Sequence, residues 1–329
     1  MPLEASHMKR IDPLGCDTTL GLSEMFYPAG FPLHLETNSR QVLEAAAESW
    51  KGFSRQFDTP PLGFRVVVEA AGGLAGEPTF RKQAHLLCFV SDGHNFSVGD
   101  SLSMTATFHL SQDTAGNSAV LRWFYLEAMA YMLLTQRYVV SVHAACVARG
   151  NSGILLCGKS GAGKSTLAMA SARAGFTYVA DDCTWLLAGS RECTAIGKPQ
   201  HVRFRHDAAR HFAELEGHLA RTRPGGKVSI EVPTDLFPSV NTASTCRIGC
   251  LVFLDREGAG PAGVARMDAA DAVEMLLAEM PSYGPEVNAI HEEAIQKLAA
   301  LPAWRLCYRS LEDGIRLLGE LAVAPDEAR

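Results

Sequence analysis

The chain has 329 residues, a length that favours two domains. Apolar residues make up 47% and charged residues 20%, as in ordinary globular proteins, and the net charge of −6 gives no indication of nucleic acid or an anionic membrane as a partner. The nine cysteines contain no Cys-x-x-Cys pair, which argues against a disulfide framework or a zinc site and favours the reducing cytoplasm.

The sequence predicts neither secretion nor membrane insertion. Residues 1–7 are interpreted as the remnant of an expression vector, with the native start at Met8. The best candidate for a membrane span, residues 119–134, is too short and is interrupted by Arg122 and Glu127.

Residues 8–135 are predicted to form a smaller α+β domain, with substrate recognition as its expected role. Gly72, Gly73 and Gly76 break the pattern after its second predicted strand. Helices are expected at 39–53 and 119–137, and strands at 31–35, 64–69, 85–90 and 101–110.

Residues 136–329 alternate between strand and helix patterns, which predicts an α/β domain. The expected strands are 138–147, 153–157, 177–181, 184–187, 202–205, 248–254 and 304–308. The expected helices are 167–174, 207–221, 269–278, 287–300 and 311–321.

Residues 158–166 read Gly-Lys-Ser-Gly-Ala-Gly-Lys-Ser-Thr and match the phosphate-binding pattern Gly-x-x-x-x-Gly-Lys-Ser/Thr. A strand precedes and a helix follows, the context that a chance glycine-rich loop would lack. The glycines let backbone N–H groups turn toward an anion, and the helix adds its positive end. We expect Lys164 to reach the β- and γ-phosphates and Ser165 to hold Mg²⁺. The expected phosphate-binding residues are Gly158, Ser160, Gly161, Ala162, Gly163, Lys164, Ser165 and Thr166.

Two adjacent acids, Asp181 and Asp182, follow the next predicted strand. Strand ends of this kind meet the ligand in open α/β sheets. One carboxylate can bind the metal and the other can accept a proton from an attacking hydroxyl, which suits phosphoryl transfer to an alcohol; a solvated turn is the alternative. Asp255, at the end of another apolar strand, competes as a metal ligand or forms a turn with Arg256.

A basic stretch stands out in this acidic chain, and arginine side chains can stabilise a transferring phosphoryl group. It contains Arg203, Arg205, Arg210, Arg221, Arg223 and Lys227. Arg223 and Lys227 lie in a glycine-rich segment and are the two expected to close over nucleotide or substrate. His143, in a predicted strand that pairs with 153–157, is by itself typical of a structural residue.

Four segments together resemble the HPr kinase/phosphorylase family over residues 138–320. They are His143, the loop 158–165, the segment Gly-Phe-Thr-Tyr-Val-Ala-Asp-Asp that ends at Asp182, and the tail 301–312. The phosphate loop alone is widespread, whereas the histidine, the loop and the two aspartates at these intervals are much more specific.

The resemblance implies a phosphoenolpyruvate-carboxykinase-like nucleotide-binding fold, with a mixed sheet flanked by helices, that phosphorylates a serine hydroxyl with ATP and Mg²⁺. It implies that His143 lies near the transferred phosphate and that Lys164 and Ser165 hold ATP and metal. It also favours Asp182 as the base and Asp181 as the metal contact, with exchange of these roles left open. Such kinases are often hexamers, which implies a homo-oligomer.

The chain also departs from the bifunctional members of the family. They carry Glu where this chain has Thr166, and their Arg-Gly-Leu-Gly signature is missing; Arg223-Pro-Gly-Gly-Lys227 lies in that neighbourhood. The sequence therefore favours a stand-alone HPr-kinase-like enzyme that phosphorylates a peptide, a protein or a small molecule. The alternatives are a nucleotide-dependent regulatory or peptide-binding module and an NTP-hydrolysing or decarboxylating enzyme that shares only the fold.

Overall fold

A computed structural model describes residues 18–222, 228–256 and 261–323. The internal contacts divide the chain into two compact units, residues 1–133 and 134–329. The residues 1–7, interpreted as a vector remnant, and the two cations Arg223 and Lys227 lie outside the described residues.

The N-terminal unit is built on a mixed sheet with the strand order β1-β2-β3-β7-β6-β5-β4. β2, β3 and β7 pair in parallel, and the other pairs are antiparallel. The strands are β1 (Leu22–Phe26), β2 (Leu33–Thr37), β3 (Leu62–Glu69), β4 (Thr79–Gln83), β5 (Leu86–Val90), β6 (Phe96–Asp100) and β7 (Thr105–Ser111).

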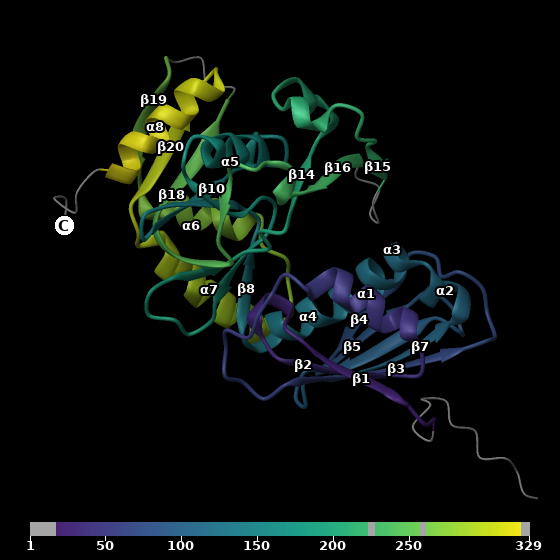
Figure 1. Ribbon diagram of the computed structural model, residues 1–329. Helices are drawn as coiled ribbons and strands as arrows, with labels where there is room; N and C mark the ends of the chain where they lie inside the picture. The colour runs from purple at the N-terminus through teal and green to yellow at the C-terminus, as the bar shows by residue number, and fades with distance from the viewer. Residues whose placement is uncertain (1–17, 223–227, 257–260, 324–329) are drawn as a thin grey trace, which may run out of the picture. The chain divides into compact units, whose positions relative to one another are not determined.

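Helices α1 and α4 lie over one face of this sheet (Figure 1). Helix α1 buries Val42, Ala45, Ala46 and Trp50, whose spacing places them on one helical face. The helical segments of this part of the chain are η1 (Pro28–Gly30), α1 (Arg40–Trp50), α2 (Gln112–Gly116), α3 (Ser118–Val120), η2 (Leu121–Leu126) and α4 (Glu127–Arg137).

Two sequence predictions for this unit need correction. The single helix expected at 119–137 is divided, because the segment Leu121–Leu126 is a π-helical turn between α3 and α4. The strands β1, β4 and β6 were missed; β4 is mostly exposed, so its sequence carries little apolar alternation.

The C-terminal unit is a second mixed sheet, with the main order β17-β11-β9-β10-β18-β13-β12-β8. The long strand β18 also pairs in parallel with β20, which in turn pairs with β19. The strands are β8 (Val139–Val142), β9 (Ala145–Arg149), β10 (Ser152–Cys157), β11 (Thr177–Ala180), β12 (Thr184–Leu187), β13 (Thr194–Ile196), β17 (Asn241–Thr242), β18 (Thr245–Asp255), β19 (Gly263–Met267) and β20 (Ala303–Cys307).

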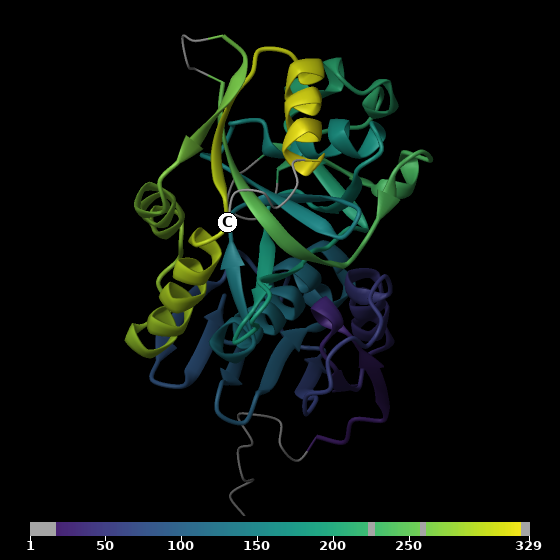
Figure 2. The same cartoon turned by 90° about the vertical axis from the view of Figure 1, so that its left-hand side faces the viewer.

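Helices cover both faces of this sheet. On β10, Ile154 and Leu156 pack in one core with α5 (Lys164–Arg173) and α8 (Leu311–Val323). Leu155 and Cys157 face the opposite core, with α6 (Ala269–Ala278) and α7 (Pro285–Ala299). Successive strand residues point to opposite faces, so β10 is apolar throughout. Figure 2 shows the yellow helix α8 and the olive helices α6 and α7 on opposite sides of the green strand β18.

A small antiparallel sheet, in the order β14-β16-β15, adjoins helix α5. Its strands are β14 (His201–Phe204), β15 (Arg221–Thr222) and β16 (Val228–Pro233), and a short helix η5 (Thr234–Leu236) follows. The helix expected at 207–221 is wrong: this segment forms two short turns, η3 (His206–Arg210) and η4 (Ala213–Leu215). The ring of Phe212 packs against Phe204 and Phe237, and this aromatic cluster replaces a regular helical face.

The strand expected at 138–147 is also wrong, because it is two strands that separate at His143. β8 pairs with β12, whereas β9 pairs with β10, so the chain changes partner between Val142 and Ala145. Within the described residues, no helix has both the length and the apolar character needed to cross a membrane.

Candidate functional site

The loop between β10 and α5 is a tight turn in which three glycines have positive φ values. Gly158, Gly161 and Gly163 have φ values of 139°, 95° and 94°, which favour glycine over residues with a side chain. The N–H of Ala162 donates to the carbonyl of Lys159 at 3.0 Å and closes the turn. A Cβ atom on Gly163 would lie 3.0 Å from the hydroxyl oxygen of Tyr308, so the loop also requires glycine for space.

The first turn of α5 carries the polar side chains of the motif. Lys164 is 6% exposed, and its ammonium group donates to the carbonyl oxygens of Gly158 at 2.6 Å and Lys159 at 3.3 Å. These contacts hold the cation against the base of the loop. The hydroxyl of Ser165 donates to the backbone carbonyl of Asp181 at 3.3 Å, which connects the helix start to the end of β11.

His143 lies between two carboxylates. Its Nε2 atom is 3.4 Å from Asp182 and its Nδ1 atom is 3.0 Å from Glu279, the residue that ends helix α6. The hydrogen bond with Asp182 raises the pKa of His143, burial opposes this, and the hydrogen bond with Glu279 raises it further. The hydrogen bond from His143 in turn lowers the pKa of Glu279. The arrangement favours a protonated imidazolium at this position.

The two adjacent aspartates occupy different environments. Asp181 is buried, and its carboxylate accepts a hydrogen bond of 2.6 Å from the backbone N–H of Arg203. Burial raises the pKa of Asp181 to about 6, although the charge of Arg203 opposes this. The side chain of Asp182 is 46% exposed. Asp182 is therefore the carboxylate that a ligand can reach, and Asp181 supports it from behind.

Three arginines lie near the loop, and they come from two segments of the chain. Arg205, after β14, donates to the hydroxyl of Ser160 at 3.0 Å, and Arg203 pairs with Glu231 of β16 at 2.6 Å. Arg256, after β18, lies beside Gly163, since a Cβ atom placed there would be 3.4 Å from its side chain. The guanidinium groups add positive charge around the anion-binding turn.

These groups line one cavity of about 550 Å³. Lys164, Ser165 and Thr166 form one part of its wall, while His143 and Asp182 form another. Ser160, Gly161 and Gly163 of the loop also line it, as do Arg203, Arg205 and Arg256. The cavity thus joins an anion-binding loop to a histidine and a carboxylate that can exchange protons.

Half of the residues that line this cavity were predicted from the sequence as site residues. Asp255 does not line the cavity, although the next residue, Arg256, does. Glu279 and Arg256 were missed as site residues, because neither belongs to a sequence motif. Glu279 contacts His143 from the end of α6, and Arg256 lines the cavity from the end of β18. Gly158, Ala162 and Asp181 belong to the loop or lie behind the site without lining the cavity.

No family model matches the chain, and neither does any curated protein. Among solved structures, the HPr(Ser) kinase/phosphatase from Coxiella burnetii is similar with a probability of 1.00. The match covers 56% of this chain and 93% of that chain, at 15% identity and a TM-score of 0.30. This is a distant likeness to a kinase, and at that TM-score it carries no argument about the site. The observed architecture is mixed α/β, with mixed sheets in both units.

Proposed function

We propose that the chain is an ATP- and Mg²⁺-dependent kinase that transfers the γ-phosphoryl group to a hydroxyl, with serine in a peptide or protein as the first acceptor to test and a small-molecule alcohol as the next. The observation that carries this proposal is the shared cavity, in which Asp182 and His143 face the same space as Lys164 and Ser165. An anion-binding loop alone would support only nucleotide binding. A carboxylate beside it adds a group that can accept the proton of an alcohol.

The residues fit a triphosphate. Three loop glycines hold the backbone in the positive-φ turn, and the N-terminus of α5 with Lys164 supplies positive charge. They also fit Mg²⁺, which takes one or two protein ligands and phosphate oxygens instead of a complete protein cage. The described residues contain no group of three or more His, Cys, Asp or Glu side chains arranged for a metal. Ser165 would hold the ion, with Asp181 contacting it through water from behind the cavity wall, and the ion would neutralise phosphate charge.

The transfer exchanges one P–O bond of the γ-phosphorus for another. The acceptor oxygen forms a bond to the γ-phosphorus, the bond from that phosphorus to the β–γ bridging oxygen breaks, and ADP leaves with the electron pair. Asp182 orients the hydroxyl and accepts its proton, while His143, held by Glu279, contributes positive charge next to Asp182. Lys164 stabilises the phosphate oxygens. The N-terminal unit, residues 1–133, is proposed to recognise the acceptor, and the enzyme to act in the cytoplasm, as a homo-oligomer.

The test is transfer from γ-labelled ATP, with Mg²⁺, to a panel of serine-containing peptides, proteins and alcohols. We expect Lys164→Ala to abolish nucleotide binding, and Asp182→Asn to preserve binding while transfer falls by about 10²- to 10⁴-fold, the usual contribution of a general base. Asp271→Asn, an exposed aspartate on α6, is the matched control and should behave as wild type.

The outcomes separate the two leading functions. Transfer that depends on Lys164 and Asp182 supports a kinase. Tight Mg-ATP binding without transfer to any acceptor would instead favour the nucleotide-dependent regulatory or peptide-binding module.

A further inference from the structure

A second, smaller cavity of about 180 Å³ adjoins the first one. The two share Thr166, Asp207 and Arg256 in their walls, so they meet at the first turn of α5. The remaining wall of the small cavity comes from Arg210 and His211 on one side and from the connection between β20 and α8 on the other. Its volume suits a single planar ring system better than a complete drug-sized ligand.

The direction of the bound triphosphate follows from the chemistry at the larger cavity. Its terminal phosphate has to lie near Asp182, because the acceptor hydroxyl is activated there. The opposite end then points away from Asp182, which does not line the small cavity. Thr166 is where the small cavity begins.

The walls of the small cavity carry groups that bind flat, polar ring systems. The guanidinium group of Arg256 lies over the ring of Tyr308, 5.7 Å from its centroid, and Arg309 lies on the same connection. Planar guanidinium and imidazole groups stack on aromatic faces. Arg309 and His211 are both exposed. They line the small cavity and not the larger one.

Tyr308 adds a second, independent indication of a ligand. The residue is 3% exposed, and its hydroxyl has no hydrogen-bond partner among the described residues. Burial raises its pKa, so the phenol stays neutral and can donate. A buried hydroxyl without a partner is costly in a protein unless something satisfies it. Tyr308 lines the small cavity and its oxygen lies close to Gly163, which ties this cavity to the phosphate loop.

We propose that this small cavity, lined by Arg256, Tyr308, Arg309 and His211, receives the base of the nucleoside triphosphate held by the loop. The assignment rests on the proposed function, because it takes a bound triphosphate as its starting point. It goes further by naming the residues that distinguish a nucleotide from inorganic triphosphate.

The test compares two probes, Mg-ATP and Mg-tripolyphosphate, whose dissociation constants are measured by calorimetry on the full chain. We expect wild type to bind Mg-ATP more tightly than Mg-tripolyphosphate. Arg309→Ala and His211→Ala should each weaken Mg-ATP by roughly tenfold, as loss of one stacking cation predicts, without changing tripolyphosphate affinity. Tyr308→Phe, which removes only the hydroxyl, should act in the same direction. Arg316→Ala is the control, since Arg316 lies on α8 outside both cavities.

Each result is decisive. If the two probes bind wild type equally tightly, or the Arg309 and His211 variants weaken both probes alike, the base lies elsewhere and the inference is overturned while the triphosphate site stands. If wild type binds neither probe, the proposed function itself fails. Selective loss of Mg-ATP affinity in the small-cavity variants, with both probes lost in Lys164→Ala, supports both.

Discussion

The Nδ1 atom of His143 lies 3.0 Å from a carboxylate oxygen of Glu279, although the two residues are 136 positions apart in the chain. Asp182 contacts the other ring nitrogen at 3.4 Å. A neutral imidazole would turn one lone pair toward a carboxylate, whereas an imidazolium donates to both. Asp182 and the end of helix α6 therefore act together on the orientation of His143, and both raise its pKa, Asp182 more than Glu279.

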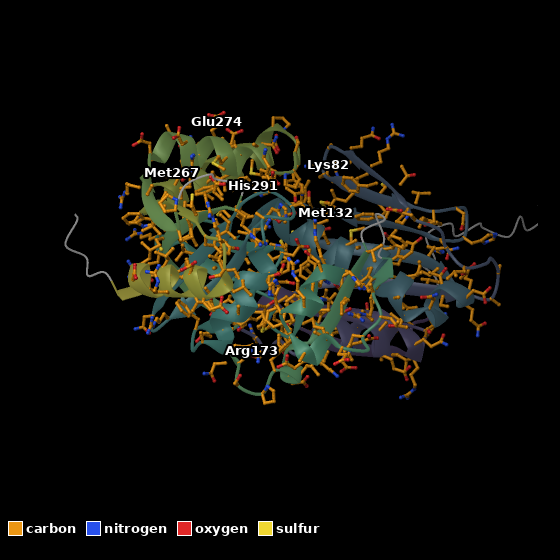
Figure 3. All side chains as sticks on the ribbon, turned by 90° about the horizontal axis from the view of Figure 1, so that it is seen from above. Lys82, Met132, Arg173, Met267, Glu274 and His291 are labelled. Atoms are coloured by element: carbon orange, nitrogen blue, oxygen red, sulfur yellow. The ribbon has the colours of Figure 1, made fainter. Side chains whose placement is uncertain are left out.

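The first prediction concerns that contact. Replacing Glu279 by glutamine removes one of the two carboxylates, so the pKa of His143 should fall, while the remaining contact with Asp182 keeps it from falling completely. The measurement is an NMR titration of the His143 ring, assigned with a His143→Asn variant. Glu274→Gln is the control, because Glu274 projects outward from α6 in Figure 3. An unchanged titration of His143 in Glu279→Gln would show that the contact does not set its charge.

The second prediction separates backbone strain from loop function. Gly163 and Gly175 flank helix α5 with nearly equal φ values of 94° and 96°, but a Cβ atom would meet Tyr308 and Arg256 at Gly163 and nothing within 4 Å at Gly175. Alanine at either site should cost about 1–2 kcal/mol of unfolding free energy. Only Gly163→Ala should also lose triphosphate affinity, by at least about tenfold, since its Cβ displaces the loop. Chemical denaturation and ligand titration measure the two effects, and equal binding by both variants would contradict the interpretation.

The third prediction distinguishes the adjacent aspartates. Asp182 lines the cavity, whereas Asp181 is buried and accepts the N–H of Arg203. Asp182→Asn should reduce the rate of phosphoryl transfer with little change in the midpoint of unfolding. Asp181→Asn keeps an amide oxygen that can accept the same N–H and removes a buried charge, whose cost is the reason that the pKa of Asp181 is raised to about 6. This variant should therefore not lower the free energy of unfolding at neutral pH, and it should reduce transfer less. Thermal melts and initial rates of both variants measure these effects. A larger loss of transfer in Asp181→Asn than in Asp182→Asn would exchange the two roles.

The fourth prediction is a pH dependence of stability that arises at a buried histidine outside the loop. His291 on α7 is 1% exposed, its Nε2 lies 3.0 Å from the carbonyl oxygen of Thr135, and its ring meets Tyr283 at 5.1 Å. Burial lowers the pKa of His291 below the ordinary value of 6.5. As the pH falls below about 6.5, His291 binds a proton in the unfolded chain but stays neutral in the folded chain. The free energy of unfolding therefore decreases.

A His291→Gln variant keeps a donor for Thr135 but cannot titrate. Its melting temperature should therefore decline less than that of wild type between pH 7.5 and pH 5, a range chosen to bracket the value of about 6.5 for the unfolded chain. His85→Gln, at an exposed residue of the N-terminal unit, serves as the control and should follow wild type. Parallel curves for wild type and His291→Gln would rule out this histidine as a source of acid sensitivity.

The sequence by itself determined the glycine-rich loop at residues 158–163 and its two flanking elements, because their signals are local. The buried strand before Gly158, the glycines that permit positive φ and the helix that starts at Lys164 all lie within about two dozen consecutive residues. The same holds for Asp181 and Asp182 at the end of β11. Helix α6 was expected with its observed bounds, since its apolar spacing follows the helical period.

Only the tertiary structure decided where the chain breaks and what completes the site. Residues 138–147 have an uninterrupted strand pattern, yet they divide at His143 because β8 and β9 hydrogen-bond to different strands, and pairing partners are not encoded locally. Arg256 lines the cavity from the end of β18, and Glu279 reaches His143, another residue of the cavity wall, from the end of α6. Contacts between residues more than a hundred positions apart depend on how the layers pack, and no local pattern of residue types carries that information.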